Sequence, residues 1–249
     1  MRIIISPAKK MNTDVDSFPC YNLPRFLPQS EELLSCLRSL SPQELQALWK
    51  CNDSIAALNL RRLAEMDLRS SLTPAILSYE GIQYQYMAPN VFTADELSYI
   101  EEHLRILSGF YGLLRPFDGV RPYRLEMQAR LTTSRGKDLY SFWGPLLAES
   151  LFAETDCILN LASKEYSLCV SRFLPPHVRF ITCVFAERKG EKLIEKGTMC
   201  KMARGDMVRY MAQLGLEAPE DVRSYGRMNY HFSPEDSDDT TYTFIKEET

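Results

Sequence analysis

Glycines and arginines recur in one stretch of this chain, ILSGFYGLLRPFDGVRPYR at residues 106–124. A glycine turn lets backbone N–H groups approach a phosphate without a Cβ in the way, and neighbouring arginines add positive charge. Two helices joined by such a turn would grip a nucleic-acid backbone without reading its sequence. The residues in or directly before this stretch that we predict to contact an anion are Arg105, Gly109, Gly112, Arg115, Arg121 and Arg124.

A packed helical corner without a ligand also fits this stretch. Phe110, Tyr111 and Tyr123 either stack on unpaired bases or belong to the hydrophobic core, which is the commoner place for such residues. Arg124 likewise either binds an anion or forms an ion pair with Glu126. Both interpretations stay open on the sequence.

Three further stretches place cations at expected ends of strands or helices. SPAKK at 6–10 follows an apolar run, NLASKEY at 160–166 leads from a strand into a helix, and ARG at 203–205 lies where a strand gives way to a helix. Because ligand sites in α/β proteins favour the carboxyl ends of strands, these stretches together favour a basic cleft. Its predicted cations are Lys9, Lys10, Lys164 and Arg204. Taken singly, each has an ordinary interpretation as a solvated side chain, and Ser163 as a helix cap.

An enzyme that acts on a small anionic substrate is the alternative function. The polar residues that would form its pocket are Ser6, Lys9, Arg124, Glu126, Asn160, Ser163 and Arg204. Lys9 would serve as nucleophile or base and Glu126 as general acid or base. The sequence holds no GxSxG, P-loop or HExxH motif, so it assigns no reaction.

Charge and composition limit the class of protein. The 249 residues carry a net charge of −4 and are 45% hydrophobic, which is typical of a globular chain. Residues 104–137 hold seven Lys or Arg against two acids, whereas 233–249 hold six acids against Lys246 and form an acidic tail. No apolar run approaches the ~20 residues that span a bilayer, and the amino-terminal run is too short for a signal peptide. We therefore expect a cytoplasmic protein with no membrane partner.

Cysteine and histidine spacing indicates neither a metal site nor a cofactor. The seven cysteines form no CxxC motif, and the three histidines lie far apart. We expect reduced, mostly buried thiols, with no residue selected as redox-active.

The expected elements alternate between strands and helices without a linker or repeat. Capping boxes at Ser41 and Thr93 start helices, and the second helix is expected to run through Leu104 and Leu107 until Gly109 breaks it. The expected ranges are strands at 2–5, 156–161, 178–187, 192–195 and 240–245, helices at 29–69, 93–107, 138–152 and 205–214, and a loop at 12–28. This order predicts a single mixed α/β domain over 1–249, with a mixed sheet flanked by helices and a helix-hairpin-helix-like element around 108–112.

Five ordered motifs resemble the YaaA family of bacterial peroxide-stress proteins, and the resemblance runs from end to end. They are ISPAKK (5–10), LRILSGFYGLLRPFDGVRPYRLEM (104–127), GKDLYSFW (136–143), NLASKEY (160–166) and ARG (203–205). The resemblance implies a cytosolic α/β protein with a helix-hairpin-helix-like element and a positively charged cleft. It also implies survival of hydrogen peroxide, limitation of free intracellular iron, and binding of duplex or distorted DNA without sequence preference.

Carried over by motif, the resemblance assigns DNA contact to particular residues. They are Lys9, Arg105, Gly109, Gly112, Arg115, Arg121, Arg124, Lys137 and Arg204. Lys10 stands where a threonine is expected, and Cys200-Lys-Met precedes ARG where another lysine is common. The second difference removes one cation, which would lower the affinity for polyanions.

Overall fold

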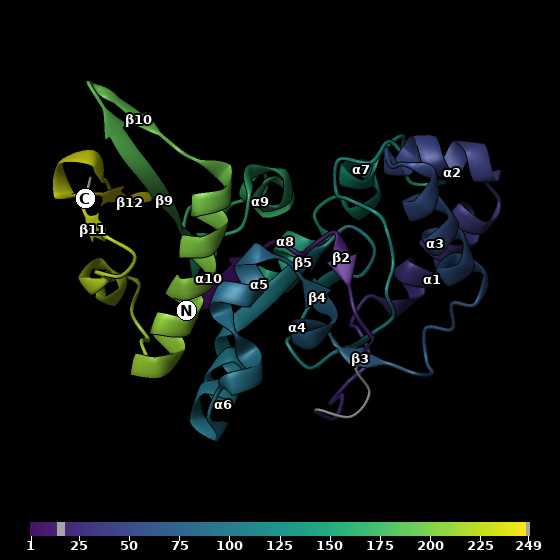
Figure 1. Ribbon diagram of the computed structural model, residues 1–249, viewed down its shortest axis with the longest axis horizontal. Coiled ribbons are helices and arrows are strands. Elements are labelled where there is room, and N and C mark those ends of the chain that lie inside the picture. The colour runs from purple at the N-terminus through teal and green to yellow at the C-terminus, as the bar shows by residue number, and fades with distance from the viewer. Residues whose placement is uncertain (14–17, 248–249) are drawn as a thin grey trace.

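One mixed sheet forms the centre of the molecule. The structure is a computed structural model, and it describes residues 1–13 and 18–247. The strand order is β11-β12-β9-β8-β1-β5-β6, and β10 pairs with β9 (Figure 1). The parallel strands are β1 (Arg2–Ile5), β5 (Leu104–Ser108), β8 (Cys157–Leu161), β9 (Arg179–Lys189) and β12 (Thr241–Lys246). The antiparallel strands are β6 (Gly112–Leu114), β10 (Lys192–Ile194) and β11 (Tyr230–Phe232). This sheet confirms the predicted mixed α/β class.

Two short strand pairs lie outside the main sheet. β2 (Lys10–Met11) pairs with β4 (Tyr79–Glu80), and β3 (Thr73–Pro74) pairs with β7 (Gly119–Val120). The first pair fixes the segment that follows β1 against the start of α5.

Helices cover the sheet and extend the molecule at one end. In Figure 1, α1 (Leu27–Arg38), α2 (Pro42–Trp49) and α3 (Asp53–Ala64) lie together at the right, away from β11 and β12 at the left. The other α-helices are α4 (Ala75–Ser78), α5 (Ile82–Met87), α6 (Ala94–His103), α7 (Leu139–Trp143), α8 (Leu146–Phe152), α9 (Lys164–Ser171) and α10 (Gly197–Leu214). Short 3-10 helices occupy Pro89–Val91, Pro219–Ser224 and Pro234–Asp236. No helix of the described residues is both long enough and apolar enough to cross a membrane.

Local capping chemistry was predicted correctly. The side chains of Ser41 and Thr93 accept from the backbone N–H of the residue three positions on, and Glu44 and Glu96 accept from the backbone N–H of the cap. These contacts satisfy orphan amides at the helix starts, so they depend on a few adjacent residues only.

The predicted helix through Leu107 is wrong beyond His103. Residues 104–108 form β5, which pairs in parallel with β1 and antiparallel with β6. Every residue of β5 is buried, and a strand buried on both faces shows a continuous apolar run instead of alternation. A helical hairpin therefore does not exist at 104–127.

A short αα-hairpin, which the sequence analysis did not single out, lies elsewhere in the chain. α2 ends at Trp49, α3 begins at Asp53, and the three residues between them make the hairpin. Lys50 adopts the left-handed region at φ 47°, which ends α2, and the Asn52 side chain caps α3. The prediction of a helix-hairpin-helix-like element around 108–112 is wrong, because that segment is the turn between β5 and β6. We call α2 and α3, at 42–64, the α2–α3 hairpin.

Other boundaries also moved. Residues 138–152 form two helices, because Gly144 and Pro145 interrupt them. α10 begins at Gly197 and not at 205. The predicted last strand at 240–245 is β12, and the acidic residues before it lie in the 3-10 helix at Pro234–Asp236 and the residues that follow it. The predicted loop at 12–28 contains residues 14–17, and the acidic segment ends at 248–249; both ranges lie outside the described residues.

Candidate functional site

A cavity of about 380 Å³ lies at the carboxyl ends of β1 and β8. The chain leaves β1 for β5 on one side and later adds β8 on the other, which makes this edge a topological switch point. We call it the Lys9 cavity. Its polar lining comprises Ser6, Lys9, Lys10, Glu80, Gln83, Arg124, Glu126, Ser163, Glu165, Lys201 and Arg204, and tyrosines 84, 123 and 166 also line it.

Carboxylates hold several of its cations in place. Arg124 Nε lies 2.9 Å from Glu126 Oε1, and Lys9 Nζ lies 3.7 Å from the same oxygen. The Arg124 and Glu126 side chains are only 11% and 12% exposed, whereas that of Lys9 is 65% exposed. Lys10 pairs with Glu80 at 2.5 Å, which joins the segment after β1 to β4. The cavity thus combines buried ion pairs with a mobile, solvated ammonium at its rim.

Two buried polar atoms that line this cavity, Gln83 Nε2 and Arg204 Nε, lack a hydrogen-bond partner. Arg124 Nε and Glu126 Oε1 make no well-aligned hydrogen bond either, but they form the ion pair at 2.9 Å with each other. A buried donor or acceptor without a partner costs about 1–3 kcal/mol, so most such atoms in folded proteins are satisfied. The two unpartnered atoms at one cavity indicate a place built for a polar ligand.

Ser6 and Ser163 join the two strand ends at the floor of the cavity. Ser6 Oγ accepts from the Ser163 backbone N–H at 2.8 Å and lies 3.2 Å from Ser163 Oγ. The Ser6 carbonyl accepts from the Tyr84 hydroxyl at 2.9 Å. Ser163 is the N-cap of α9 as predicted, but its side chain caps no amide because it faces Ser6.

Asn160 is a structural brace and does not line the cavity. Its Oδ1 accepts from the Ala162 backbone N–H at 2.9 Å, and its Nδ2 donates to Thr182 Oγ1 at 3.2 Å. The catalytic role that was considered for this residue has no geometric support, because both ends of the amide hold the loop after β8.

Glu165 adds a third carboxylate, which the sequence analysis did not select. Burial raises the pKa of Glu165, although the backbone N–H of Gln128, which donates to its carboxylate, acts to lower it. Gln83, Tyr84 and Lys201 were missed as well. Lys201 precedes Arg204 by three residues on α10, so a helix started at Gly197 would have placed both on one face.

Three glycines allow the segments around the cavity to pack closely against one another. A Cβ at Gly205 would lie 2.0 Å from the Gln83 carbonyl oxygen, so this glycine lets α10 touch α5. A Cβ at Gly81 would lie 2.9 Å from the Ala8 Cβ, and one at Gly109 would lie 2.5 Å from the Leu125 carbonyl oxygen. Gly109 therefore positions the segment that carries Arg124 and Glu126.

The predicted phosphate cradle at 108–112 is absent. The backbone N–H groups of Phe110 and Tyr111 donate to Ser108 Oγ inside the protein, and both aromatic side chains are fully buried. Gly112 has a positive φ of 77° and packs against Trp143, so it serves the β5–β6 turn. Tyr123 is buried and its hydroxyl bonds to Tyr79 and Ser108. The core interpretation is confirmed for Phe110 and Tyr111, whereas Tyr123 is buried but also lines the Lys9 cavity.

The remaining predicted cations do not line the Lys9 cavity. Arg121 donates to the Ser71 carbonyl at 3.0 Å and braces a loop. Lys137 and Lys164 are exposed, one before α7 and the other at the start of α9. Arg204 does line the cavity, but from the middle of α10 and not from a strand-to-helix junction.

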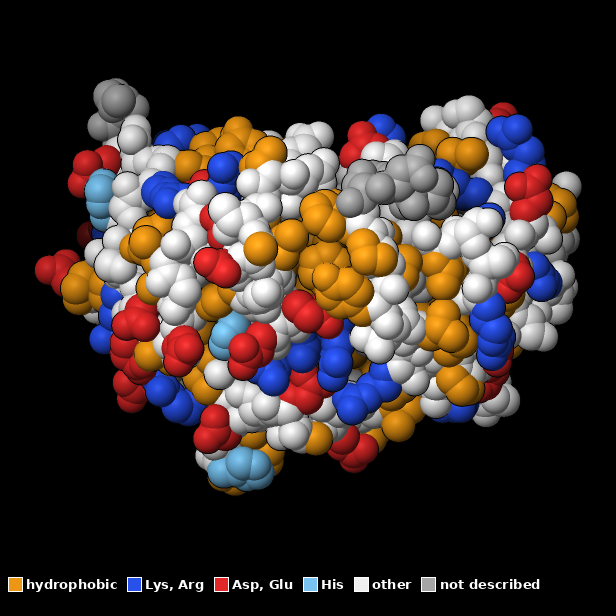
Figure 2. Space-filling model, turned by 90° about the horizontal axis from the view of Figure 1, so that it is seen from below, with side chains coloured by type: hydrophobic (Ala, Val, Ile, Leu, Met, Phe, Trp, Pro, Cys, Tyr) orange, Lys and Arg blue, Asp and Glu red, His pale blue; other side chains and the backbone are white. Residues whose placement is uncertain are grey.

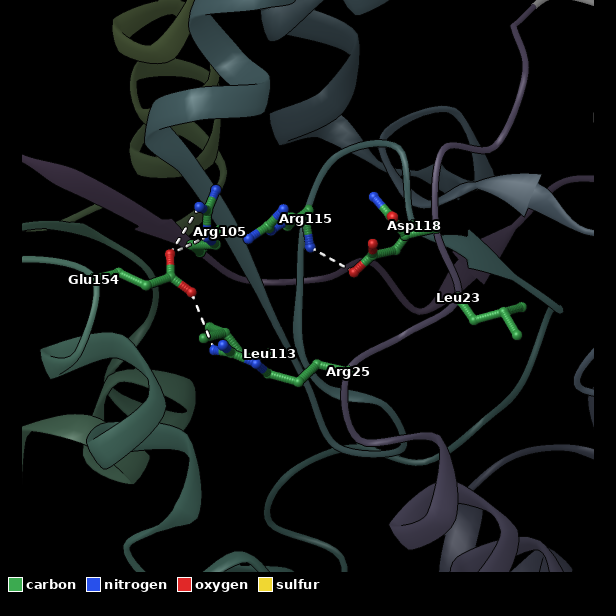
Figure 3. Close-up of a pocket in the computed structure, with 8 residues that line it drawn as sticks. Leu23, Arg25, Arg105, Leu113, Arg115, Asp118 and Glu154 are labelled. Carbon is green, nitrogen blue, oxygen red and sulfur yellow. Dashed lines mark hydrogen bonds and ion pairs between the residues drawn. The ribbon is translucent and has the colours of Figure 1, made fainter.

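Arg105 and Arg115 belong to a separate pocket of about 200 Å³ at the amino-terminal edge of β5. Arg105 is buried and donates to Glu154 Oε2 through Nε at 2.8 Å and Nη2 at 2.7 Å. Figure 3 shows the Arg115 side chain directed toward Arg105, while its backbone N–H donates to Asp118. The molecular face in Figure 2 carries Lys and Arg side chains gathered around acidic ones. Arg105 therefore braces the fold around Glu154, whereas Arg115 is exposed beside it, and both lie far from the strand ends that bear Lys9.

Asp118 gives the arginine pocket a pH-dependent stability. Burial raises its pKa from 3.8 to about 7, although the Arg115 N–H opposes this. The folded state then keeps a proton that the unfolded chain releases near pH 4, so this contribution is complete at low pH and is lost as the pH rises through 7. Between pH 5 and pH 8, we expect the free energy of unfolding to fall by about 2 kcal/mol relative to Asp118→Asn. Urea unfolding across this range measures the difference, and the exposed Asp239→Asn is the control whose profile should follow the parent.

A second cavity, of about 480 Å³, adjoins the first at Lys9 and Glu126. We call it the Trp49 cavity. It runs between α2 and the segment 128–132, and Lys50 and Arg130 contribute its exposed cations. The two cavities share Lys9 and Glu126 in their linings, and we call them together the cleft; the α2–α3 hairpin lies beside the Trp49 cavity. In the view of Figure 1, β2, which begins directly after Lys9, lies between α5 and α10 on one side and α1–α3 on the other.

Six of the described cysteines lie where burial disfavours an activated thiol. Burial raises the pKa of Cys20, Cys36, Cys157, Cys169, Cys183 and Cys200. A raised pKa disfavours the thiolate, which is the form that reacts with peroxide. Within residues 1–13 and 18–247, no group of three or more His, Cys, Asp or Glu side chains is placed to hold a metal ion.

Comparison with known proteins identifies the family of this chain. A sequence profile described as "Peroxide stress protein YaaA" matches residues 1–236. The chain belongs to the peroxide stress protein YaaA family. A UPF0246 protein of Lachnoclostridium phytofermentans is 55% identical over 249 residues, which is 100% of this chain and 98% of that protein. A UPF0246 protein of Agathobacter rectalis is 50% identical over 244 residues, which is 98% of each chain.

The YaaA family motifs divide between the two regions of the structure. ISPAKK, NLASKEY and ARG meet at the Lys9 cavity through Lys9, Ser163 and Arg204. The motif at 104–127 reaches the cavity only at its end, through Tyr123 to Glu126, while its start forms β5 and the arginine pocket.

Proposed function

We propose that this member of the peroxide stress family acts in the cytoplasm by binding DNA without sequence preference along the cleft. The observation that carries the proposal is that two neighbouring cavities share Lys9 and Glu126 and lie next to the α2–α3 hairpin. Exposed cations stand along it at Lys9, Lys10, Lys50, Arg130 and Lys201. Sequence-independent binding needs such cations at phosphate spacing and no base contacts.

The limitation of free iron that the family resemblance implies belongs to the same proposal. We assign no iron ligand, and the lowered free iron would follow indirectly from the DNA-bound state during peroxide stress.

Salt dependence of DNA binding tests the cleft. Five cations in contact with phosphates give a slope of log affinity against log salt of about −4.5. We expect the triple variant Lys9→Ala, Lys50→Ala, Arg130→Ala to reduce the slope by about 3 and to weaken binding equally for unrelated duplexes. Fluorescence anisotropy with labelled duplexes measures both quantities.

Lys192 on β10 supplies the matched control. It is exposed and lies on the strand that pairs with β9, outside the cleft lining. Lys192→Ala should leave slope and affinity within error of the parent. A triple variant that binds like Lys192→Ala would refute DNA binding in the cleft.

A small anionic molecule is the second candidate ligand, because the buried, unpartnered Gln83 Nε2 and Arg204 Nε line the Lys9 cavity. On this alternative the protein is an enzyme whose pocket contains Ser6, Lys9, Glu126 and Ser163. A rise in Tm when free phosphorylated compounds are added to DNA-free protein supports it, since a ligand that binds only the folded state stabilises that state.

A further inference from the structure

We propose that the Lys9 cavity holds one nucleotide unit, delivered by a DNA strand that lies in the cleft. The inference rests on the proposed DNA binding and adds a specific occupant for the enclosed end of the cleft. At about 380 Å³ the cavity falls within the range of small-ligand sites, about 300–1,000 Å³, and admits a nucleotide but not a duplex.

The charges of the cavity suit a phosphate. Five cations line it, Lys9, Lys10, Arg124, Lys201 and Arg204, against the carboxylates of Glu80, Glu126 and Glu165. Arg124 and Arg204 are 11% and 14% exposed; Arg124 Nε is paired with Glu126, whereas Arg204 Nε has no hydrogen-bond partner. Guanidinium groups in such a buried position donate paired hydrogen bonds to phosphate oxygens.

The tyrosines of the cavity suit a base. The Tyr84 hydroxyl donates to the Ser6 carbonyl, and the Tyr123 hydroxyl bonds to Ser108 and Tyr79. The Tyr166 hydroxyl is engaged by the Met127 backbone. Because these hydroxyls are satisfied within the protein, the rings contribute apolar surface to the cavity, and such surface favours a planar base.

Gln83 supplies a group that recognises a base edge. It is buried on α5, and its Nε2 has no partner although it lines the cavity. A glutamine amide both donates to and accepts from the polar edge of a base. A phosphate, a flat apolar surface and a free amide in one cavity together fit a nucleotide better than a simple oxyanion.

The nucleotide reaches the cavity from the cleft. Lys9 and Glu126 line both cavities, so the Lys9 cavity adjoins the rest of the cleft that the proposed strand follows. Extruding a paired base costs free energy, and this cost is smallest for a nucleotide that is already unpaired. DNA with one unpaired nucleotide should therefore bind more tightly than the matched duplex.

The test compares a perfect duplex with the same duplex carrying one bulged nucleotide. In anisotropy titrations we expect the parent to bind the bulged DNA about tenfold more tightly, as stacking of one base provides. Gln83→Leu should abolish this preference by weakening the binding of the bulged DNA about tenfold, with a much smaller change for the perfect duplex. Gln85→Leu is the matched control, because Gln85 is exposed on the same helix and should keep the preference.

Further variants and a free nucleotide separate the outcomes. Arg204→Lys keeps the positive charge but loses the paired donors of the guanidinium, so it should also reduce the preference for bulged DNA. This variant replaces Gln83→Leu in the test if circular dichroism shows that Gln83→Leu does not fold. Equal affinity of the parent for both DNAs overturns the nucleotide site while DNA binding stands. If neither DNA binds but free dAMP or dTMP does, and Gln83→Leu loses it, the cavity is a nucleotide site and the proposed DNA binding fails. Binding of neither DNA nor mononucleotide overturns both.

Discussion

Glu154→Gln should lower the free energy of unfolding by about 3–4 kcal/mol at neutral pH. Glu154 accepts from Arg105 through two nitrogens, and Arg2 Nε and Arg25 Nη1 lie 3.3 Å and 3.2 Å from its two carboxylate oxygens. The Arg105 side chain is only 4% exposed, so the neutral glutamine leaves a buried guanidinium without a counter-charge. Urea unfolding at pH 7 measures the loss.

Glu149→Gln is the control for this substitution. Glu149 is exposed on α8, and its replacement should change the stability by less than about 0.5 kcal/mol. If both variants unfold at the same urea concentration, the ion pair contributes nothing to stability. The DNA affinity of Glu154→Gln should equal that of the parent, because the arginine pocket and the cleft share no lining residue.

The same ion pair makes the protein sensitive to acid. Burial opposes ionisation of Glu154, but Arg105 and Arg2 outweigh it and lower its pKa. Its contribution is present above the ordinary glutamate pKa and is lost as the pH falls through the lowered value. Glu154 and Asp118 therefore act in opposite directions, and stability should be greatest between the two pKa values.

Gly205→Ala should have the second large effect, with a loss of about 3 kcal/mol. Alanine favours a helix interior by about 1 kcal/mol over glycine, so helix propensity alone predicts stabilisation. The added Cβ would lie 2.0 Å from the Gln83 carbonyl oxygen, however, and a backbone atom in α5 has no room to yield without moving the helix. Because α5 carries Gln83 and Tyr84, the substitution should also remove the preference for bulged DNA.

Gly197→Ala separates helix propensity from the steric effect. Gly197 lies at the start of the same helix, and its Cβ would meet no atom within 4 Å. It should leave stability and DNA binding close to those of the parent. A Gly205→Ala protein as stable as Gly197→Ala would show that α5 is not packed against α10 as the structure has it.

Features that depend on neighbouring residues were determined by the sequence alone. The capping boxes at Ser41 and Thr93 formed as predicted, because side-chain oxygens and the first free amides of a helix lie within three residues of each other. The strand at 2–5 followed from its apolar run before Pro7, and the strand-end position of Lys9 followed from that strand.

Features that depend on distant pairing were decided by the tertiary structure. The spacing of Leu97, Ile100, Leu104 and Leu107 fits a helix, but pairing of Leu104 and Ile106 with β1 turns the second half into β5. Because residues 104–108 form a strand and not a helix, Arg105 and Arg115 lie at the opposite edge of the sheet from Lys9, and the expected helical hairpin does not form.

The candidate site shows the same division. Lys9, Glu126, Ser163 and Arg204 could be selected as polar residues near strand ends, yet only the parallel register of β1 and β8 and the contact at Gly205 bring them to one cavity. Gln83 carried no sequence signal, because its side chain becomes significant only once α5 buries it without a partner. Helix caps depend only on adjacent residues. The burial of side chains and their convergence on one cavity depend on which strands pair, and this pairing joins residues more than 100 positions apart.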